Sequence, residues 1–238
     1  MLKKLSIWLL FVLAGISLAM STVLLFDASG SMGEYITAKN GSSVKKIDAA
    51  KDAAYYLLDQ VKSGDEIALI VFYDCTNIKT EIGFTTNMQS IKDKIKTIKA
   101  TSDTPIAGAI KFADNYISTS GKKGAGIIIL TDGEETCSGD PVSAATNTTG
   151  SGTVSMINVV GFDVQKNSNT ETKLKSIATA GKGNYYSAGD KTELGTALTS
   201  AYQSQQSQKS KEQQWLCCPS SMSLGLILLG SLFFTIKK

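Results

Sequence analysis

Apolar residues along the chain follow two alternating patterns. Short and nearly unbroken apolar runs, most of them rich in β-branched residues, predict buried strands at residues 22–26, 66–72, 125–130 and 153–162, and we expect a further short strand at 184–186. Between these runs, apolar residues recur every three or four positions. That spacing predicts amphipathic helices at residues 47–61, 88–98, 105–118, 141–147, around 174–177, and 191–202. Because strands alternate with helices and are apolar on both faces, we expect an α/β fold. It should be a doubly wound, mostly parallel central sheet flanked by helices.

A further apolar stretch lies at the N-terminus and is typical of a secretory signal. It begins at Leu5 behind the charged pair Lys3 and Lys4, and ends at Ser17-Leu18-Ala19, which has the small residues that a signal peptidase requires. We therefore predict a signal peptide over residues 1–19, cleaved after Ala19. The competing interpretation continues the apolar run through residue 26 as an uncleaved membrane anchor.

The C-terminal end is typical of a membrane anchor. An uncharged stretch at residues 215–236 is closed by Lys237 and Lys238. We predict a transmembrane helix over 216–236 and a cytoplasmic basic end at 237–238, which places the middle of the chain outside. A buried core helix is the alternative. Residues 203–214 contain no apolar side chain and are expected to bury nothing, so we predict a polar linker over 204–215, stiffer if the preceding helix runs into it, that tethers a folded domain of residues 20–203.

Charge and composition exclude several functions. The formal charge is +3, but the 24 basic residues are all lysine and the chain has no histidine. A Ser-His-Asp triad, a Cys-His dyad, a histidine zinc site and an arginine finger are therefore absent. Four lysines lie at the extreme ends, which leaves 20 lysines against 21 acidic residues between them, a charge of −1. The chain thus gives no electrostatic reason to expect a nucleic-acid partner.

Oxygen-bearing side chains gather where the predicted strands end. Asp27, Ser29 and Ser31 follow the first strand, Asp132 follows the third, and Thr104 heads a helix. Loops at the carboxyl ends of parallel strands converge, and an all-oxygen set suits Mg²⁺, or Mn²⁺ or Ca²⁺. The alternative is that these residues only form turns and helix caps beside glycine.

Three motifs carry a resemblance to a known family. The strings DASGSM, SDTPIAGAI and LTDGEET, in this order, resemble the three metal-site loops of the von Willebrand factor type A domain, over residues 22 to about 202. The resemblance implies a metal-ion-dependent adhesion site at the same five residues, with an open coordination position that accepts an acidic group of a protein partner. It also implies that residues 22–26 are the first strand, which leaves a leader too short to favour a permanent span.

The cysteines form two pairs. Cys75 and Cys137 belong to loops at the same end of the predicted sheet, where export would allow a disulfide. The chain also resembles a bacterial branch of the family with further cysteines near positions 142 and 176, where it has Val142 and Ser176. This resemblance implies that Cys75 and Cys137 form the remaining bridge, two free thiols being the alternative.

Cys217 and Cys218 lie beside the predicted anchor, where we interpret them as candidates for acylation or for processing of the tail, or as incidental thiols.

Acidic residues surround the predicted metal site. They are expected to hinder an acidic ligand, to add a second cation site, or to form an ordinary solvated rim. They are Asp74, Asp103, Glu134, Glu135 and Asp140.

From these features we expect a metal-dependent protein-binding or adhesion module, carried by a single-pass membrane protein with its domain on the cell surface or in the periplasm. The alternative is a membrane-anchored scaffold for assembly of envelope or membrane complexes that does not depend on metal. We expect no enzymatic activity, because no serine has a plausible base beside it, although a divalent ion could in principle activate water.

Overall fold

The structure is a computed structural model that describes residues 19–37, 41 and 43–217. Its strands are β1 (Ser21–Asp27), β2 (Tyr35–Thr37), β3 (Ser43–Lys45), β4 (Glu66–Asp74), β5 (Asn77–Thr85), β6 (Ala125–Thr131), β7 (Val154–Phe162) and β8 (Lys182–Ala188). Its helices are the 3₁₀ helix η2 (Gly30–Gly33) and the α-helices α2 (Lys46–Gln60), α3 (Met88–Thr97), α4 (Ile106–Thr119), α5 (Pro141–Gly150), α6 (Asn169–Ala180) and α7 (Lys191–Cys217).

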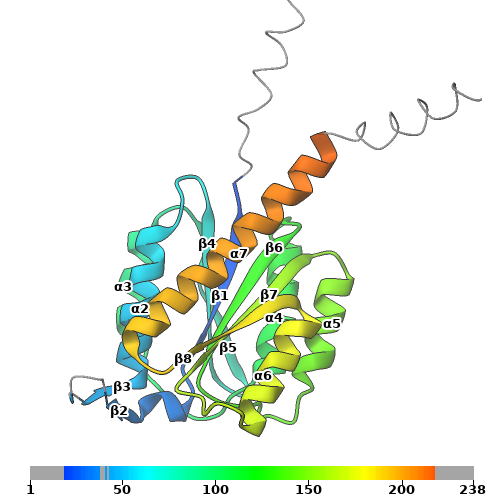
Figure 1. The fold of residues 1–238 in the computed structure, drawn as a ribbon. Helices are drawn as coiled ribbons and strands as arrows, with labels where there is room; N and C mark the ends of the chain where they lie inside the picture. The colour runs from blue at the N-terminus through cyan, green and yellow to red at the C-terminus, as the bar shows by residue number, and fades with distance from the viewer. Residues whose placement is uncertain (1–18, 38–40, 42, 218–238) are drawn as a thin grey trace, which may run out of the picture.

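Six strands form one twisted sheet in the order β5-β4-β1-β6-β7-β8 (Figure 1). All neighbouring pairs are parallel except β4 with β5, which are antiparallel. The chain leaves β1 toward β4 on one side and later returns to β6 on the other. The strand order therefore reverses beside β1, and in such a sheet the crevice for a ligand opens at this point, beyond the carboxyl ends of the strands.

Helices cover both faces of the sheet. One apolar layer packs the sheet against α2, α3 and α7, and the other packs it against α4, α5 and α6. Alternate residues of β1 enter opposite layers: Leu24 and Phe26 the first, Val23 and Leu25 the second. All four are completely buried, which explains why this strand is apolar without alternation. The predicted doubly wound, mostly parallel fold is confirmed.

The strands that the sequence pattern did not predict are the polar ones. Most residues of β5 are only partly buried, and none is fully buried, because this strand lies at the edge of the sheet. The β2–β3 hairpin has three residues in each strand and a single buried side chain, Ile36. Strands of this kind lack the continuous apolar run that reveals a central strand.

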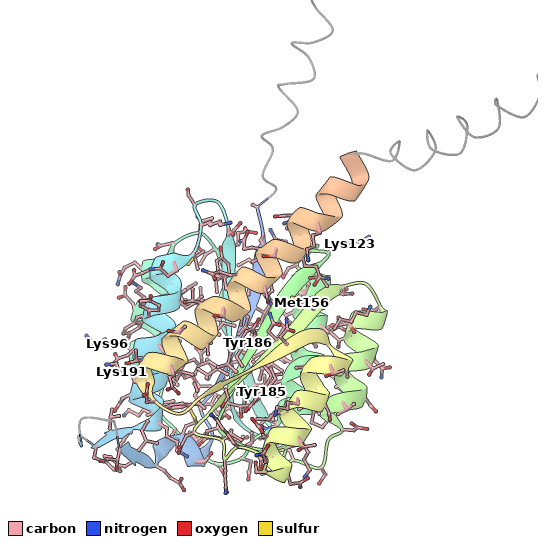
Figure 2. All side chains as sticks on the ribbon, in the orientation of Figure 1. Lys96, Lys123, Met156, Tyr185, Tyr186 and Lys191 are labelled. Carbon is pink, nitrogen blue, oxygen red and sulfur yellow. A yellow bond between two sulfur atoms is a disulfide. The ribbon has the colours of Figure 1, made fainter. Side chains whose placement is uncertain are left out.

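Helix α7 corrects the predicted linker. The helix was expected to end near residue 202, but it continues to Cys217 without a break at residue 203. The expectation that the polar segment buries nothing is wrong at Gln205, which is only 3% exposed. One residue earlier, Ser204 Oγ lies 4.0 Å from the sulfur of Met156, which Figure 2 labels on β7 beneath α7.

No helix among residues 19–37, 41 and 43–217 is long and apolar enough to cross a membrane. The predicted anchor at 216–236 and basic end at 237–238 lie outside the described residues, except for residues 216 and 217 at the end of α7. Of the predicted signal peptide, only Ala19 lies within them.

Candidate metal centre

The carboxyl end of β1 forms the centre of the candidate site. Asp27 is the last residue of this strand, and the 3₁₀ helix η2 follows after Ala28 and Ser29. The neighbouring loop after α3 is held against this turn, because Gly30 N donates to Ser102 O at 2.8 Å and Thr101 N donates to Ala28 O at 2.8 Å. A Cβ atom on Gly30 would lie 3.1 Å from Ser102 O, so the close approach of the two loops favours glycine there.

Asp27 is a fully buried carboxylate. Its Oδ1 accepts a hydrogen bond from Ser29 N at 2.7 Å, and its Oδ2 accepts one from Thr131 Oγ1 at 2.6 Å. Burial, followed by the negative charge of Asp132, raises the pKa of Asp27 to about 7, although these hydrogen bonds lower it. The position therefore disfavours a bare negative charge, and a cation beside it would stabilise the ionised form.

Three other predicted residues form a chain of polar contacts beside Asp27. Ser29 Oγ lies 3.2 Å from Ser31 Oγ, and Ser31 Oγ donates to Asp132 Oδ1 at 2.7 Å. The sequence separates Ser31 from Asp132 by 101 residues, so the contact depends on β1 and β6 being adjacent strands. The structure thus brings together Asp27, Ser29, Ser31 and Asp132 from two loops.

Thr104 comes from a third loop and is 95% buried. Its backbone N donates to Thr136 Oγ1 at 2.8 Å, and its carbonyl accepts from Thr136 N at 3.0 Å. These bonds attach Thr104 to the loop that follows Asp132. Within the described part of the chain, no hydrogen bond joins its hydroxyl to the other four predicted ligands. Its loop contacts the Asp27 turn through Ser102.

Sequence reasoning missed a cation in this site, Lys46. Its Nζ lies 3.1 Å from Asp132 Oδ2, 3.2 Å from Asp163 Oδ2 and 3.6 Å from Glu34 Oε2. Burial opposes the charge of Lys46, but the carboxylates of Asp132 and Asp163 outweigh it and raise the pKa of Lys46. The side chain of Asp132 is 1% exposed, so this ammonium is its main neutralising charge. No local motif marks this lysine, because the β2–β3 hairpin separates it from the Asp27 turn.

The donor set fits a small divalent cation. Two carboxylates and three hydroxyls from three loops provide the oxygen ligands that Mg²⁺ prefers. The pKa of Asp27 is raised because its carboxylate is buried beside the carboxylate of Asp132. A divalent ion bound between them would offset both negative charges and stabilise the ionised form of Asp27. Over the residues that the structure describes, no group of three or more His, Cys, Asp or Glu side chains could hold a metal, so the hydroxyls are essential to this fit.

The acidic residues around the site support loop structure. Asp74 accepts from Thr76 N, Asp140 accepts from Ser143 N, and Glu135 accepts from Ala107 N. Glu134 accepts from Thr170 Oγ1 and forms an ion pair with Lys173, while Asp103 accepts from the neighbouring Ser102 Oγ. Of the three interpretations of this rim, these contacts favour the ordinary rim over a second cation site, and hindrance of an acidic ligand stays a prediction.

A disulfide joins Cys75 to Cys137, which are 62 positions apart in sequence. It connects the β4–β5 turn to the loop that follows Asp132. The structure therefore contains the bridge expected from the sequence. Cys217 is the last residue of α7 and Cys218 lies outside the described residues, so acylation or processing there stays a prediction.

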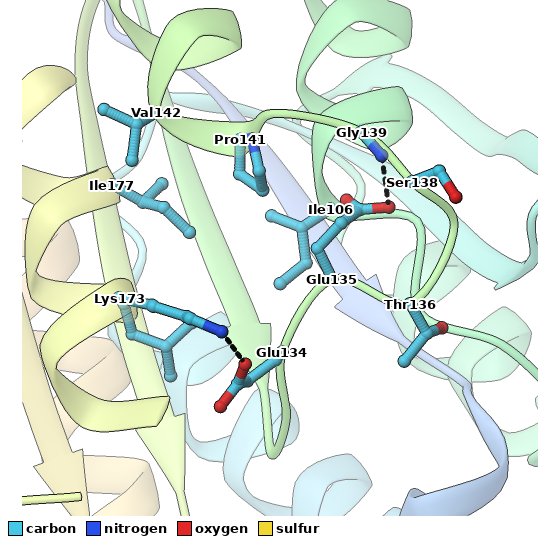
Figure 3. Close-up of a pocket in the computed structure, with 11 residues that line it drawn as sticks. Ile106, Glu134, Glu135, Thr136, Ser138, Gly139, Pro141, Val142, Lys173 and Ile177 are labelled. Carbon is cyan, nitrogen blue, oxygen red and sulfur yellow. Dashed lines mark hydrogen bonds and ion pairs between the residues drawn. The ribbon is translucent and has the colours of Figure 1, made fainter. Parts of the chain in front are cut away.

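A pocket of about 420 Å³ adjoins the loop after Asp132 (Figure 3). Ile106 of α4, Val142 of α5 and Ile177 of α6 contribute apolar walls. The Glu134–Lys173 ion pair closes one side of it. Thr136 also lines the pocket and bonds to the backbone of Thr104, so the pocket and the oxygen cluster share one loop.

Comparison with known proteins identifies the domain. The von Willebrand factor type A domain model matches residues 22–135. The uncharacterized protein YwmC of Bacillus subtilis (strain 168) is 31% identical in an alignment of 182 residues that covers 71% of this chain and 76% of YwmC. The uncharacterized protein YwmD of the same organism is 29% identical in an alignment of 188 residues that covers 73% of this chain and 81% of YwmD.

Solved structures share the fold at lower identity. The conserved hypothetical protein BatB from Bacteroides thetaiotaomicron has a TM-score of 0.64 at 22% identity, covering 79% of this chain and 98% of that one. The vWF domain of the type V pili tip protein Mfa5 from Porphyromonas gingivalis has a TM-score of 0.64 at 16% identity, covering 80% and 96%. With its sheet order, its matched sequence and its relatives in agreement, the chain belongs to the von Willebrand factor type A domain family.

Proposed function

We propose that this chain is an adhesion-type protein-binding module whose contacts depend on a divalent cation, Mg²⁺ or alternatively Mn²⁺ or Ca²⁺. Asp27, Ser29, Ser31, Thr104 and Asp132 would hold the ion. The observation that carries the proposal is the chain of polar contacts from Ser29 through Ser31 to Asp132, beside the buried carboxylate of Asp27. The ends of β1 and β6 and the start of α4 supply these residues. Turns that bind no ligand would not require a buried carboxylate such as that of Asp27.

The partner is proposed to contribute an acidic side chain. Mg²⁺ takes six oxygen ligands and keeps some water, and five protein side chains leave at least one position for an incoming oxygen. A carboxylate of the partner would bind there more strongly than a neutral group. The pocket beside Thr136 offers apolar walls to a neighbouring residue of the same partner.

Display outside a membrane is the second part of the proposal. Ala19 precedes β1 and therefore lies at the pole opposite to Asp27, and the C-terminal end of α7 reaches the same pole (Figure 1). If the leader and the segment 216–236 direct the chain to a membrane, the oxygen cluster would face away from it, toward partners. The likeness of fold to the vWF domain of a pili tip protein is consistent with such a position.

We propose a binding role rather than catalysis, because the site contains no histidine and the only bases in contact with Ser29 and Ser31 are the carboxylates of Asp27 and Asp132 among the described residues. The carboxylates in contact with the serine cluster would be ligands of the ion and are therefore poor proton acceptors.

The proposal is tested by copurification with the full-length, detergent-solubilised protein. Wild type is captured from its own membranes in Mg²⁺ and in EDTA, beside Ser31→Ala, which removes one proposed ligand, and Ser118→Ala, an exposed serine of α4 as control. Partners retained by wild type and Ser118→Ala in Mg²⁺, and lost in EDTA and in Ser31→Ala, support the proposal. Partners retained equally in EDTA refute it and favour the metal-independent scaffold.

A further inference from the structure

The carboxylate of Asp65 is buried near the start of the folded domain, at the opposite end of the sheet from the metal centre. Asp65 is 6% exposed and lies in the turn before β4, at the pole where the chain enters β1. Its Oδ1 accepts a hydrogen bond from the backbone N of Met20 at 2.7 Å. Its Oδ2 accepts from Tyr202 Oη at 2.6 Å and from the side-chain amide of Gln206, both on α7.

All three of these described donors are neutral in the uncleaved chain: a peptide N–H, a phenol and an amide. A buried carboxylate is better compensated by a cation, and a charge-assisted hydrogen bond is about twice as strong as a neutral one. Both oxygens of the Asp65 carboxylate therefore accept hydrogen bonds, but none of these three donors carries a positive charge to offset that of the carboxylate.

Exposure changes sharply across the Ala19–Met20 peptide bond, which is the bond predicted to be cleaved when the leader is removed. Ala19 is exposed, whereas Met20 is 2% exposed. Met20 is also fixed on its other side, because its carbonyl accepts from Glu66 N at 2.8 Å. Among the described residues, Met20 is therefore the first buried one, and it is also the first residue that cleavage after Ser17-Leu18-Ala19 would leave.

We propose that Asp65 is the receptor for the mature N-terminus, the α-ammonium group of Met20. Hydrolysis adds one water across the Ala19–Met20 peptide bond: the carbonyl carbon of Ala19 takes the hydroxyl and becomes a carboxylate, and the nitrogen of Met20 becomes an amine that is protonated. The nitrogen that donates to Asp65 then carries a positive charge at the same position. Leader removal converts a neutral hydrogen bond into a buried ion pair, which also ties β1 to α7.

The ion pair between Asp65 and the N-terminus would link the start of β1 to the C-terminal helix α7. Asp65 contacts β1 through Met20 and α7 through Tyr202 and Gln206, while Tyr202 Oη also accepts from Lys62 N at 3.0 Å. A domain that gains this ion pair only after processing is more stable as the mature form than with its leader attached. This inference does not depend on the metal centre.

The test uses the full-length chain, exported by a secreting bacterial host and purified in detergent. N-terminal sequencing should give Met20 as the first residue. The matched variant carries Gly-Ser inserted between Ala19 and Met20, which keeps every side chain and the N–H of Met20 but moves the ammonium group two residues outward. We expect wild type to melt about 3 °C or more above the insertion variant, and Asp65→Asn to abolish this difference.

Chemical labelling gives a second measurement that does not need Asp65→Asn to fold. At neutral pH, acetylation of the α-amine should be at least about tenfold slower in native wild type than in the insertion variant, because a buried, ion-paired ammonium is rarely deprotonated to the reactive amine. After unfolding in urea, the acetylation rates of the two proteins should be equal. A first residue other than Met20, or equal melting temperatures with equal labelling, overturns the proposal.

Discussion

Asp27 shows how one residue combines fold and function. It ends a strand that is buried from Thr22 onward, and its carboxylate accepts hydrogen bonds from its own turn and from Thr131 of the neighbouring strand. The sequence predicted Asp27 and its serines because the motif is local. It could not predict the Thr131 bond or the contacts of Lys46, which exist only once β1, β6 and α2 have come together.

The pKa of Asp27 predicts a pH dependence of stability in metal-free protein. Asp27 binds its proton more tightly in the folded state, where its pKa is about 7, than in the unfolded state, where it is near 3.8. The free energy of unfolding should therefore fall as pH rises from 5 to 7, by up to about 1.4 kcal/mol per pH unit. The chain has no histidine, so no side chain with an ordinary pKa titrates in this window.

Urea denaturation at several pH values in EDTA measures this slope. Asp27→Asn should flatten it, and saturating Mg²⁺ should also flatten it because the ion holds the carboxylate in its charged form. A slope of the opposite sign in metal-free wild type would contradict the burial that raises this pKa.

Removal of Lys46 should destabilise the metal-free protein. Lys46→Met leaves the buried Asp132 carboxylate without its ammonium partner, which costs on the order of 3 kcal/mol. Mg²⁺ should recover most of the loss by replacing the missing charge. Thermal denaturation with and without Mg²⁺ measures both effects, and Lys51→Met, which breaks a more exposed pair with Asp48, is the control. Equal stability of Lys46→Met and wild type in EDTA would argue against the ion pair.

At the scale of elements, the central strands and most helices could be predicted because their apolar patterns are continuous. Helix α7 was predicted too short, since its extension is polar and its burial depends on single contacts. Gln205 Nε2 donates to Ile127 O at 3.0 Å, and Gln205 Oε1 accepts from Thr22 Oγ1 at 3.0 Å. A glutamine that bonds to a strand within the sheet gives no periodic signal.

The packing of Gln205 over β6 leaves no room for a Cβ atom at Gly126 unless the buried glutamine side chain moves. A Cβ atom at Gly126 would lie 2.3 Å from the Gln205 side chain, so Gly126→Ala should cost about 1–3 kcal/mol of stability. Gly126→Ala with Gln205→Ala should be more stable than the sum of the two single changes predicts, because the second change removes the clash. Gly150→Ala, where a Cβ meets nothing within 4 Å, is the control in chemical denaturation. Simple additivity of the two substitutions would contradict this contact.

The disulfide between Cys75 and Cys137 should contribute substantially to stability. A bridge between residues 62 positions apart lowers the conformational entropy of the unfolded chain, which stabilises the folded state by about 4 kcal/mol in the loop-entropy model. Cys75→Ser with Cys137→Ser should therefore lower the denaturation midpoint, and a reducing agent should lower that of wild type but not that of the variant. Alkylation of both thiols in native, unreduced protein, detected by mass spectrometry, would contradict the bridge.

At the scale of the whole molecule, the two poles of the sheet have different chemistry. The pole at the carboxyl ends of the strands gathers Asp27, the two serines, Asp132 and Lys46, and the disulfide lies at its edge. The opposite pole holds Asp65, Met20 and the end of the domain-packed part of α7. A parallel sheet separates a binding site from both chain ends in this way because all its loops of one kind lie at one edge.

The most direct test of the proposed function is calorimetric titration of the full-length chain with Mg²⁺. Wild type is compared with Asp132→Ala and with Asp103→Ala, a neighbouring carboxylate outside the proposed ligand set. We predict one saturable site per chain in wild type and Asp103→Ala, and binding at least about tenfold weaker in Asp132→Ala, a loss of about 1.4 kcal/mol or more. No saturable binding in wild type, or equal binding in all three proteins, would contradict the metal site.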